Sequence, residues 1–133
     1  MPKSTASIAD VLNLIFNATA YSWNAVTQLD IHLHTATPGV GGTSLTNEAT
    51  YTSYALVAVN RNSGGWTVSG TCSNTGLIQF PQCTGGTNTI TYVSITPHGT
   101  TELLYFGALN SSLSVSNGIQ PQFSGGSLTI TES

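Results

Sequence analysis

The sequence predicts a mainly β, all-β-type fold, an antiparallel β-sandwich or barrel of about seven to nine short strands with one N-terminal amphipathic helix. Beyond residue 27, short apolar or alternating segments are separated by Gly, Pro and Asn-Gly turns at fairly regular spacing, which is typical of such folds. A chain of 133 residues with 39% hydrophobic content can bury the core of one domain. We therefore expect a single domain over 1–133, with an N-terminal arm over 1–6, a helix over 7–17 and a sandwich over 27–133.

The helix is predicted from the one stretch in which apolar residues recur at i, i+3, i+4 and i+7. Ser7 is placed to cap its N-terminus, and Asp10 follows three residues later in an arrangement that resembles a capping box. We expect the apolar stripe to dock on the sheet, so that truncating a buried Leu12 to alanine would cost about 2–5 kcal/mol. The stripe consists of Ile8, Val11, Leu12, Ile15 and Phe16.

The first strand is predicted over 27–35, where the period changes to two. Leu29, Ile31 and Leu33 share one face, and Asp30, His32 and His34 share the other. Residues 54–60 are apolar on both faces, as in a strand covered on each side. Further strands are expected over 66–70, 77–80, 87–95, 102–109, 112–115, 119–123 and 127–132.

Charged residues are scarce, since only two basic and five acidic residues occur among 133. Ordinary soluble domains devote about a quarter of their residues to Asp, Glu, Lys and Arg. Lys3 and Arg61 alone cannot neutralise a nucleic-acid backbone or bind an anionic membrane surface. The sequence therefore favours a packing unit over an enzyme and excludes nucleic acid and membranes as partners. A weakly charged surface opposes self-association poorly, which indicates an assembly.

No catalytic, cofactor or metal site is expected from the motifs. There is no GxSxG elbow, no carboxylate pair and no phosphate-binding glycine loop. A three-histidine metal site from His32, His34 and His98 is conceivable, but the favoured interpretation is that the His34 ring hydrogen-bonds loop backbone. Cys72 and Cys83 are expected to be half-buried, reduced strand residues, with a cross-strand disulfide as the alternative if they flank a hairpin.

Targeting segments are not expected. No run approaches the roughly 18 apolar residues of a transmembrane helix. Residues 1–20 contain an apolar stretch, but Asp10, Asn13 and Asn17 interrupt it, so we do not expect a signal peptide.

Strand aromatics such as Trp66 and Tyr105 are expected in the core or at an interface, with a sugar-binding face as the less favoured alternative.

Several segments, taken in order, resemble one family of small virion proteins of tailed bacteriophages. LHTATPG at 33–39 is similar to the family's "LHTADPG" motif, and TNEATYTSYALVAV at 46–59 resembles its "NE…YtgYaRvaV" segment. GWTVSG at 65–70, FPQCTGG at 80–86 and the stretch 103–131 also match in order.

Two departures from this family both remove a charge. Thr37 stands where the family usually has Asp, and Leu56 stands where it often has Arg. Any role of those charged residues in capping a turn or forming a salt bridge therefore cannot be transferred.

The resemblance implies a structural protein of the phage virion, made in the host cytoplasm and without catalytic residues. The first reading is a capsid decoration (cement) protein that binds the outer shell as a homotrimer, with the major capsid protein as its partner. A single compact domain without fibrous repeats favours it. The alternative is a minor tail or tail-fibre-associated protein that binds tail proteins, and a carbohydrate-binding module on the virion surface is third.

Two segments are expected to contact partners: the small, polar arm, which no pattern pairs, and the long loop over 36–48. Long loops in compact domains are often functional. The candidate contact residues are Pro2, Lys3, Ser4, Pro38, Gly39, Val40 and Leu45.

Overall fold

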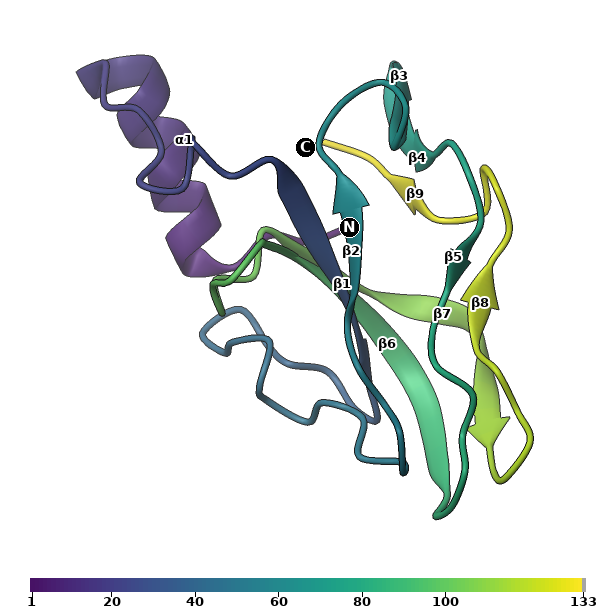
Figure 1. The fold of residues 1–133 in the computed structure, drawn as a ribbon. Coiled ribbons are helices and arrows are strands. Elements are labelled where there is room, and N and C mark those ends of the chain that lie inside the picture. Colours follow the sequence, from purple (N-terminus) through teal and green to yellow (C-terminus); the bar gives the residue numbers. More distant parts are fainter. Residues whose placement is uncertain (133) are drawn as a thin grey trace.

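A computed structural model describes residues 1–132 and shows a mainly β protein with one helix at the N-terminus (Figure 1). Its sheets are antiparallel and do not close into a barrel, so the predicted sandwich class is confirmed. The elements are α1 (Thr5–Asn17), β1 (Gln28–His34), β2 (Val57–Asn60), β3 (Trp66–Ser69), β4 (Thr71–Asn74), β5 (Ile78–Gln79), β6 (Asn88–Pro97), β7 (Tyr105–Val115), β8 (Gln122–Phe123) and β9 (Thr129–Ile130).

The principal layer is a four-stranded sheet in the order β2-β1-β6-β7. Within it β1 pairs with both β2 and β6, and Leu33 lies opposite Val93. The second layer consists of the sheets β3-β4-β9 and β5-β8, which lie to one side of the principal sheet in Figure 1. Because the alternating apolar face of β1 points at this second layer, Ile31 and Leu33 are buried in one core with residues of both layers.

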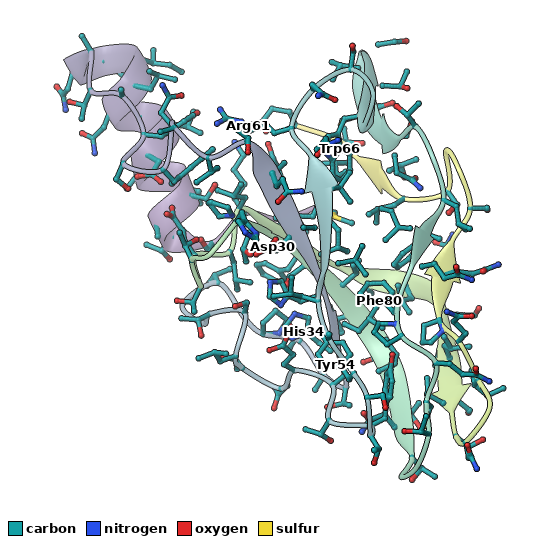
Figure 2. All side chains as sticks on the ribbon, in the orientation of Figure 1. Asp30, His34, Tyr54, Arg61, Trp66 and Phe80 are labelled. Carbon is teal, nitrogen blue, oxygen red and sulfur yellow. The ribbon has the colours of Figure 1, made fainter. Side chains whose placement is uncertain are left out.

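The centre of the core is Phe80, which is fully buried (Figure 2). Its ring stacks on Tyr54 at a centroid distance of 6.4 Å and meets Phe123 edge-on at 6.2 Å. Both cysteines are free thiols. Cys72 is half-buried in β4, as expected, whereas Cys83 is fully buried in the core and lies outside the strands, contrary to the expectation of a half-buried strand residue.

The helix begins two residues earlier than the sequence indicated. Ser4, not Ser7, is the N-cap, and its hydroxyl accepts a hydrogen bond from the Ser7 backbone N–H at 3.2 Å. Ser7 is instead buried against the body. At the other end Ala18 adopts the left-handed conformation at φ 50° and its N–H returns to the Asn13 carbonyl, which ends the helix.

The expectation that the apolar stripe of α1 is core is wrong for the single chain. Ile8, Leu12, Ile15 and Phe16 are 46%, 49%, 64% and 76% exposed, and Val11 is half-buried. The helix reaches away from the sheets instead of lying on them (Figure 1). Periodicity identified an apolar face, but it carries no information about what covers that face. The cost expected for a buried Leu12 therefore does not apply to the isolated chain.

Three strand predictions also need correction. β2 is an edge strand beside β1, and its residues are half-buried or exposed, so it is not covered on both faces. β4 was not predicted, since its sequence TCSN has neither alternation nor apolar content. The segments expected as separate strands over 102–109 and 112–115 form one strand, β7, whose pairing with β6 is irregular between Ile90 and Tyr92.

Candidate functional site

The polar face of β1 is covered by the loop that follows it, and its side chains are hydrogen-bonded within the protein. The His32 Nδ1–H donates to the Glu48 carboxylate at 2.6 Å, and its Nε2 lies 3.0 Å from the Thr96 hydroxyl. The Tyr54 hydroxyl donates to the same Glu48 oxygen at 2.7 Å and accepts from the Leu33 N–H at 3.1 Å. Glu48 thus joins the covering loop to β1.

His34 is fully buried beside this cluster (Figure 2). Its Nδ1–H donates to the Thr46 carbonyl at 2.9 Å, so the expected hydrogen bond to loop backbone is confirmed, and Nε2 lies 2.7 Å from the Ser94 hydroxyl. Burial lowers the pKa of His34, although the Thr46 carbonyl opposes this. A neutral imidazole satisfies both contacts, which is the arrangement of a structural histidine.

His98 lies at a different place on the sheet. Its Nδ1–H donates to the buried Asp30 carboxylate at 2.7 Å, and the Gly99 N–H donates to the same group at 3.2 Å. The fold therefore does not bring the three histidines to one metal ion. Among residues 1–132, no group of three or more His, Cys, Asp or Glu side chains is arranged to hold a metal.

Burial alone would raise the pKa of Glu48, but the hydrogen bonds from His32 and Tyr54 outweigh it, so the pKa is lowered. Burial and the neighbouring carboxylate raise the pKa of Tyr54. The lowered pKa keeps the Glu48 carboxylate ionised at neutral pH, and the raised pKa keeps the Tyr54 hydroxyl protonated. The cluster is suited to fixing the loop and does not present a free acid or base.

The departure at Thr37 has a structural explanation. The Thr37 hydroxyl accepts from the Gly39 N–H at 3.2 Å, which is a turn-capping bond of the kind that Asp also makes. Asn47, in the left-handed conformation at φ 56°, donates from Nδ2 to the Thr37 carbonyl at 3.1 Å. Leu56, the other departure, is 39% exposed on the approach to β2.

The N-terminal arm is paired with the body, contrary to expectation. The Pro2 carbonyl accepts from the Phe106 N–H of β7 at 3.0 Å, and Lys3 forms an ion pair with Glu132. The Ser4 hydroxyl donates to the Leu103 carbonyl. The first residue of α1, Thr5, donates its N–H to the Val40 carbonyl at 2.9 Å, so the arm and the loop over 36–48 meet at the base of the helix.

The candidate contact residues differ in accessibility. Val40 and Leu45 are 58% and 70% exposed, whereas Ser4 and Pro38 are buried within the chain. Pro2 is exposed, and Lys3 and Gly39 are half-buried. Their contact with a partner stays a prediction.

A cluster of aromatic and charged side chains fastens α1 to the body, and sequence reasoning missed it. Trp23 Nε1–H donates to Asp10 at 3.2 Å, and Tyr21 stacks on Trp23 at 4.5 Å. The Arg61 guanidinium lies 5.0 Å from the Trp23 ring centre and also donates to the Asn24 carbonyl at 3.0 Å. The one available signal was that Arg61 is the sole arginine of a chain almost without charge.

Glu102, which precedes β7, contacts Asp10 of the helix. Burial, together with the hydrogen bond and negative charge of Asp10, raises the pKa of Glu102 to about 7. Between pH 4.5, the ordinary pKa of a glutamate side chain, and about pH 7, the folded protein keeps a proton on Glu102 that the unfolded chain has lost. The free energy of unfolding therefore falls as the pH rises through this window.

Glu102→Gln removes this charge while keeping the side chain's size. We expect it to raise the free energy of unfolding at pH 8 by on the order of 1 kcal/mol, because solvent screening reduces the full effect of the shift. Urea unfolding at pH 5 and pH 8 measures this, with the exposed Glu132→Gln as the matched control. An equal gain in both variants would contradict the Asp10–Glu102 contact.

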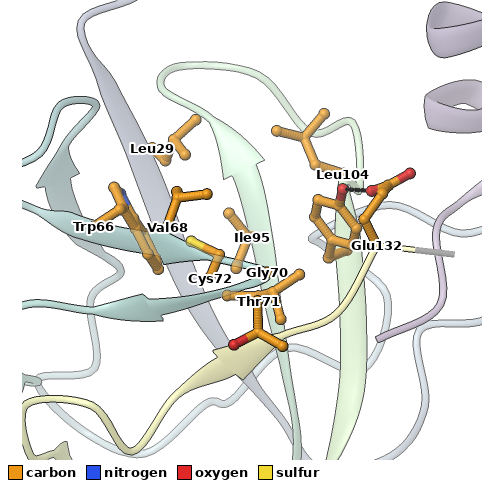
Figure 3. Close-up of a pocket in the computed structure, with 11 residues that line it drawn as sticks. Leu29, Trp66, Val68, Gly70, Thr71, Cys72, Ile95, Leu104 and Glu132 are labelled. Carbon is orange, nitrogen blue, oxygen red and sulfur yellow. Dashed lines mark hydrogen bonds between the residues drawn. The ribbon is translucent and has the colours of Figure 1, made fainter.

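The apolar recess of Figure 3 lies between the two layers and has a volume of about 250 Å³. Leu29, Val68 and Ile95 line it together with Trp66. Glu132 stands at its side and accepts a hydrogen bond from Tyr105 (Figure 3). Its lining residues include one carboxylate, Glu132, and one free thiol, Cys72, whose pKa is raised by burial. The other lining side chains are mostly apolar, so the recess is mainly a surface for apolar contact.

No helix within residues 1–132 is both long and apolar enough to cross a membrane. Among the strand aromatics, Trp66 and Phe106 are buried, and Tyr105 and Phe123 are half-buried against the core.

Comparison with known proteins identifies one family. The model of the family described as "Podophage GP4 fiber I protein gp80" matches residues 2–131, and the chain belongs to this family. No curated protein sequence matches the chain. The family confirms that the chain is a structural protein of a bacteriophage virion.

Proposed function

We propose that this protein is a fibre-associated or tail-associated structural component of the phage particle, without enzymatic activity. The observation that carries the proposal is the match to a fibre protein family over residues 2–131. The polar cluster supports it, because His32, His34 and Glu48 are all engaged in hydrogen bonds that hold the loop on β1.

Capsid decoration is the second candidate function. The chain forms a compact sandwich from short strands, and among residues 1–132 it has no extended fibrous repeat. Such a body suits a protein that covers a shell as well as one that joins a fibre to a tail. The partner is then the major capsid protein in place of tail proteins.

The attachment relies on apolar and backbone contacts in either case. Lys3 is paired with Glu132, and Arg61 is held against Trp23, so neither cation is available to steer association. At physiological salt a Debye length of about 8 Å screens them further. Exposed apolar side chains such as Val40 and Leu45 are available for contact with a partner.

We therefore expect binding to particle components that changes little with salt. Labelled protein is mixed with isolated tails and, separately, with shells that lack it, at low and high salt, and occupancy is followed. Occupancy of tails supports the proposal, and occupancy of shells alone supports capsid decoration. Protein that ignores both, or that dissociates at high salt, would contradict the proposed mode of attachment.

A further inference from the structure

The exposed stripe of α1 has the spacing of a coiled-coil seam. Ile8, Leu12 and Ile15 are separated by four and then three residues, which are the steps of a heptad with Leu12 at position a and the two isoleucines at d. All three side chains are about half exposed or more. Phe16, at 76% exposure, flanks the seam.

The seam points away from the rest of the chain. Successive residues of a helix are rotated by about 100°, which places Asp10 about 160° from both Ile8 and Leu12, and Ser7 about 100° from Ile8 and about 140° from Leu12. Ser7 is buried and Asp10 bonds Trp23, so the N-terminal half of α1 turns this side to the body. Leu14, which follows on the same side, is 42% exposed. The body therefore leaves the seam open to a neighbour.

The charges of α1 favour a second copy of the same helix as that neighbour. The first turn has no acidic residue and the last turn has no basic residue. Asp10, the one charged residue of α1, is engaged by Trp23. A charged partner would find nothing to pair with, whereas identical helices can approach without repulsion.

The side-chain types indicate how many copies meet. Leu at a with Ile at d favours bundles of three or four parallel helices over dimers. A helix of 13 residues is marginal in water alone, so packing of its apolar face is what would stabilise it.

We propose that α1 of three or four copies of this chain associates in parallel around a symmetry axis, with Ile8, Leu12 and Ile15 forming the seam. A parallel ring about one axis gives each copy the same environment. The inference concerns the oligomer itself and applies at either site on the particle.

The mass of the purified protein in solution tests this directly. Light scattering after size exclusion, across a hundredfold concentration range, is expected to give three or four times the chain mass of 13.8 kDa. Leu12→Glu is expected to give monomers that retain the β circular-dichroism spectrum. Asn13→Glu adds the same charge next to the seam and should keep the oligomer. A wild-type protein that is monomeric or dimeric throughout, or an oligomer that survives Leu12→Glu, would overturn the proposal.

Cross-linking tests the parallel direction. In parallel helices Ile8→Cys residues face each other, and mild oxidation should give covalent dimers on a denaturing gel. In antiparallel helices Ile8 of one copy would lie opposite Ile15 of the other. The two Ile8 positions would then be about 10 Å apart along the axis, which is beyond disulfide reach. The wild-type chain, with half-buried Cys72 and buried Cys83, is the control. Failure of Ile8→Cys to cross-link above that control overturns the parallel seam.

Discussion

Replacing Phe80 with alanine is expected to destabilise the protein by about 3–5 kcal/mol, as truncation of buried aromatic side chains does. Phe80 is fully buried and contacts the rings of Tyr54 and Phe123, one from each side of the sandwich core. The cavity left by its ring would lie beside the β5-β8 sheet. Each strand of that sheet has only two residues, so few backbone hydrogen bonds are present to hold it in place once the ring is lost.

Urea unfolding followed by circular dichroism measures this effect. Leu77→Ala is the matched control, because Leu77 lies three residues away and is 56% exposed. Its change should stay below about 1 kcal/mol, as expected of a surface truncation. Similar midpoints for the two variants would show that Phe80 is not central to the core.

Replacing Glu48 with alanine is expected to cost about 3 kcal/mol at pH 7. The change removes the acceptor of two hydrogen bonds, and it leaves the His32 ring and the Tyr54 hydroxyl without their partner. Each buried polar group that loses its partner costs about 1–3 kcal/mol. The side chain of His32 is 3% exposed, so water cannot readily replace the carboxylate.

The cost should depend on pH with a definite sign. The folded pKa of Glu48 is lowered below its ordinary 4.5, so its contribution is present above pH 4.5 and is lost as the pH falls through the folded value. The difference between wild type and Glu48→Ala should therefore shrink on acidification. Glu132→Ala is the control: its carboxylate contacts Lys3 and Tyr105 but is 56% exposed, so its loss should cost at most about 1 kcal/mol. A pH-independent difference would argue against the ionised Glu48 as the acceptor.

The strands were predictable where a local pattern reports burial. β1 follows from alternation, because Leu29, Ile31 and Leu33 must face a core that the chain's apolar content can supply. β4 could not be predicted from its own sequence, because it is a strand only through its pairing with β3 and β9. These two strands are distant from one another in the sequence.

The candidate site, like the strands, was predictable in part. The bonding of His34 to loop backbone was predictable from a histidine before a Pro-Gly turn. The role of Glu48 was not, because a carboxylate fourteen residues beyond His34 meets the strand only after the loop has folded back. The amphipathic pattern of α1 was read correctly as an apolar face and wrongly as core, since the pattern of an intramolecular contact and that of an intermolecular one are the same.

A cryo-EM map of the purified phage particle tests most directly whether this chain is a virion component assembled through its outward helix. We expect the sandwich to occur in several symmetry-related copies on the tail or a fibre, with Ile8, Leu12 and Ile15 of each copy buried against α1 of its neighbours. Particles that lack the protein, or that contain it with the α1 seam facing solvent, would contradict this assembly.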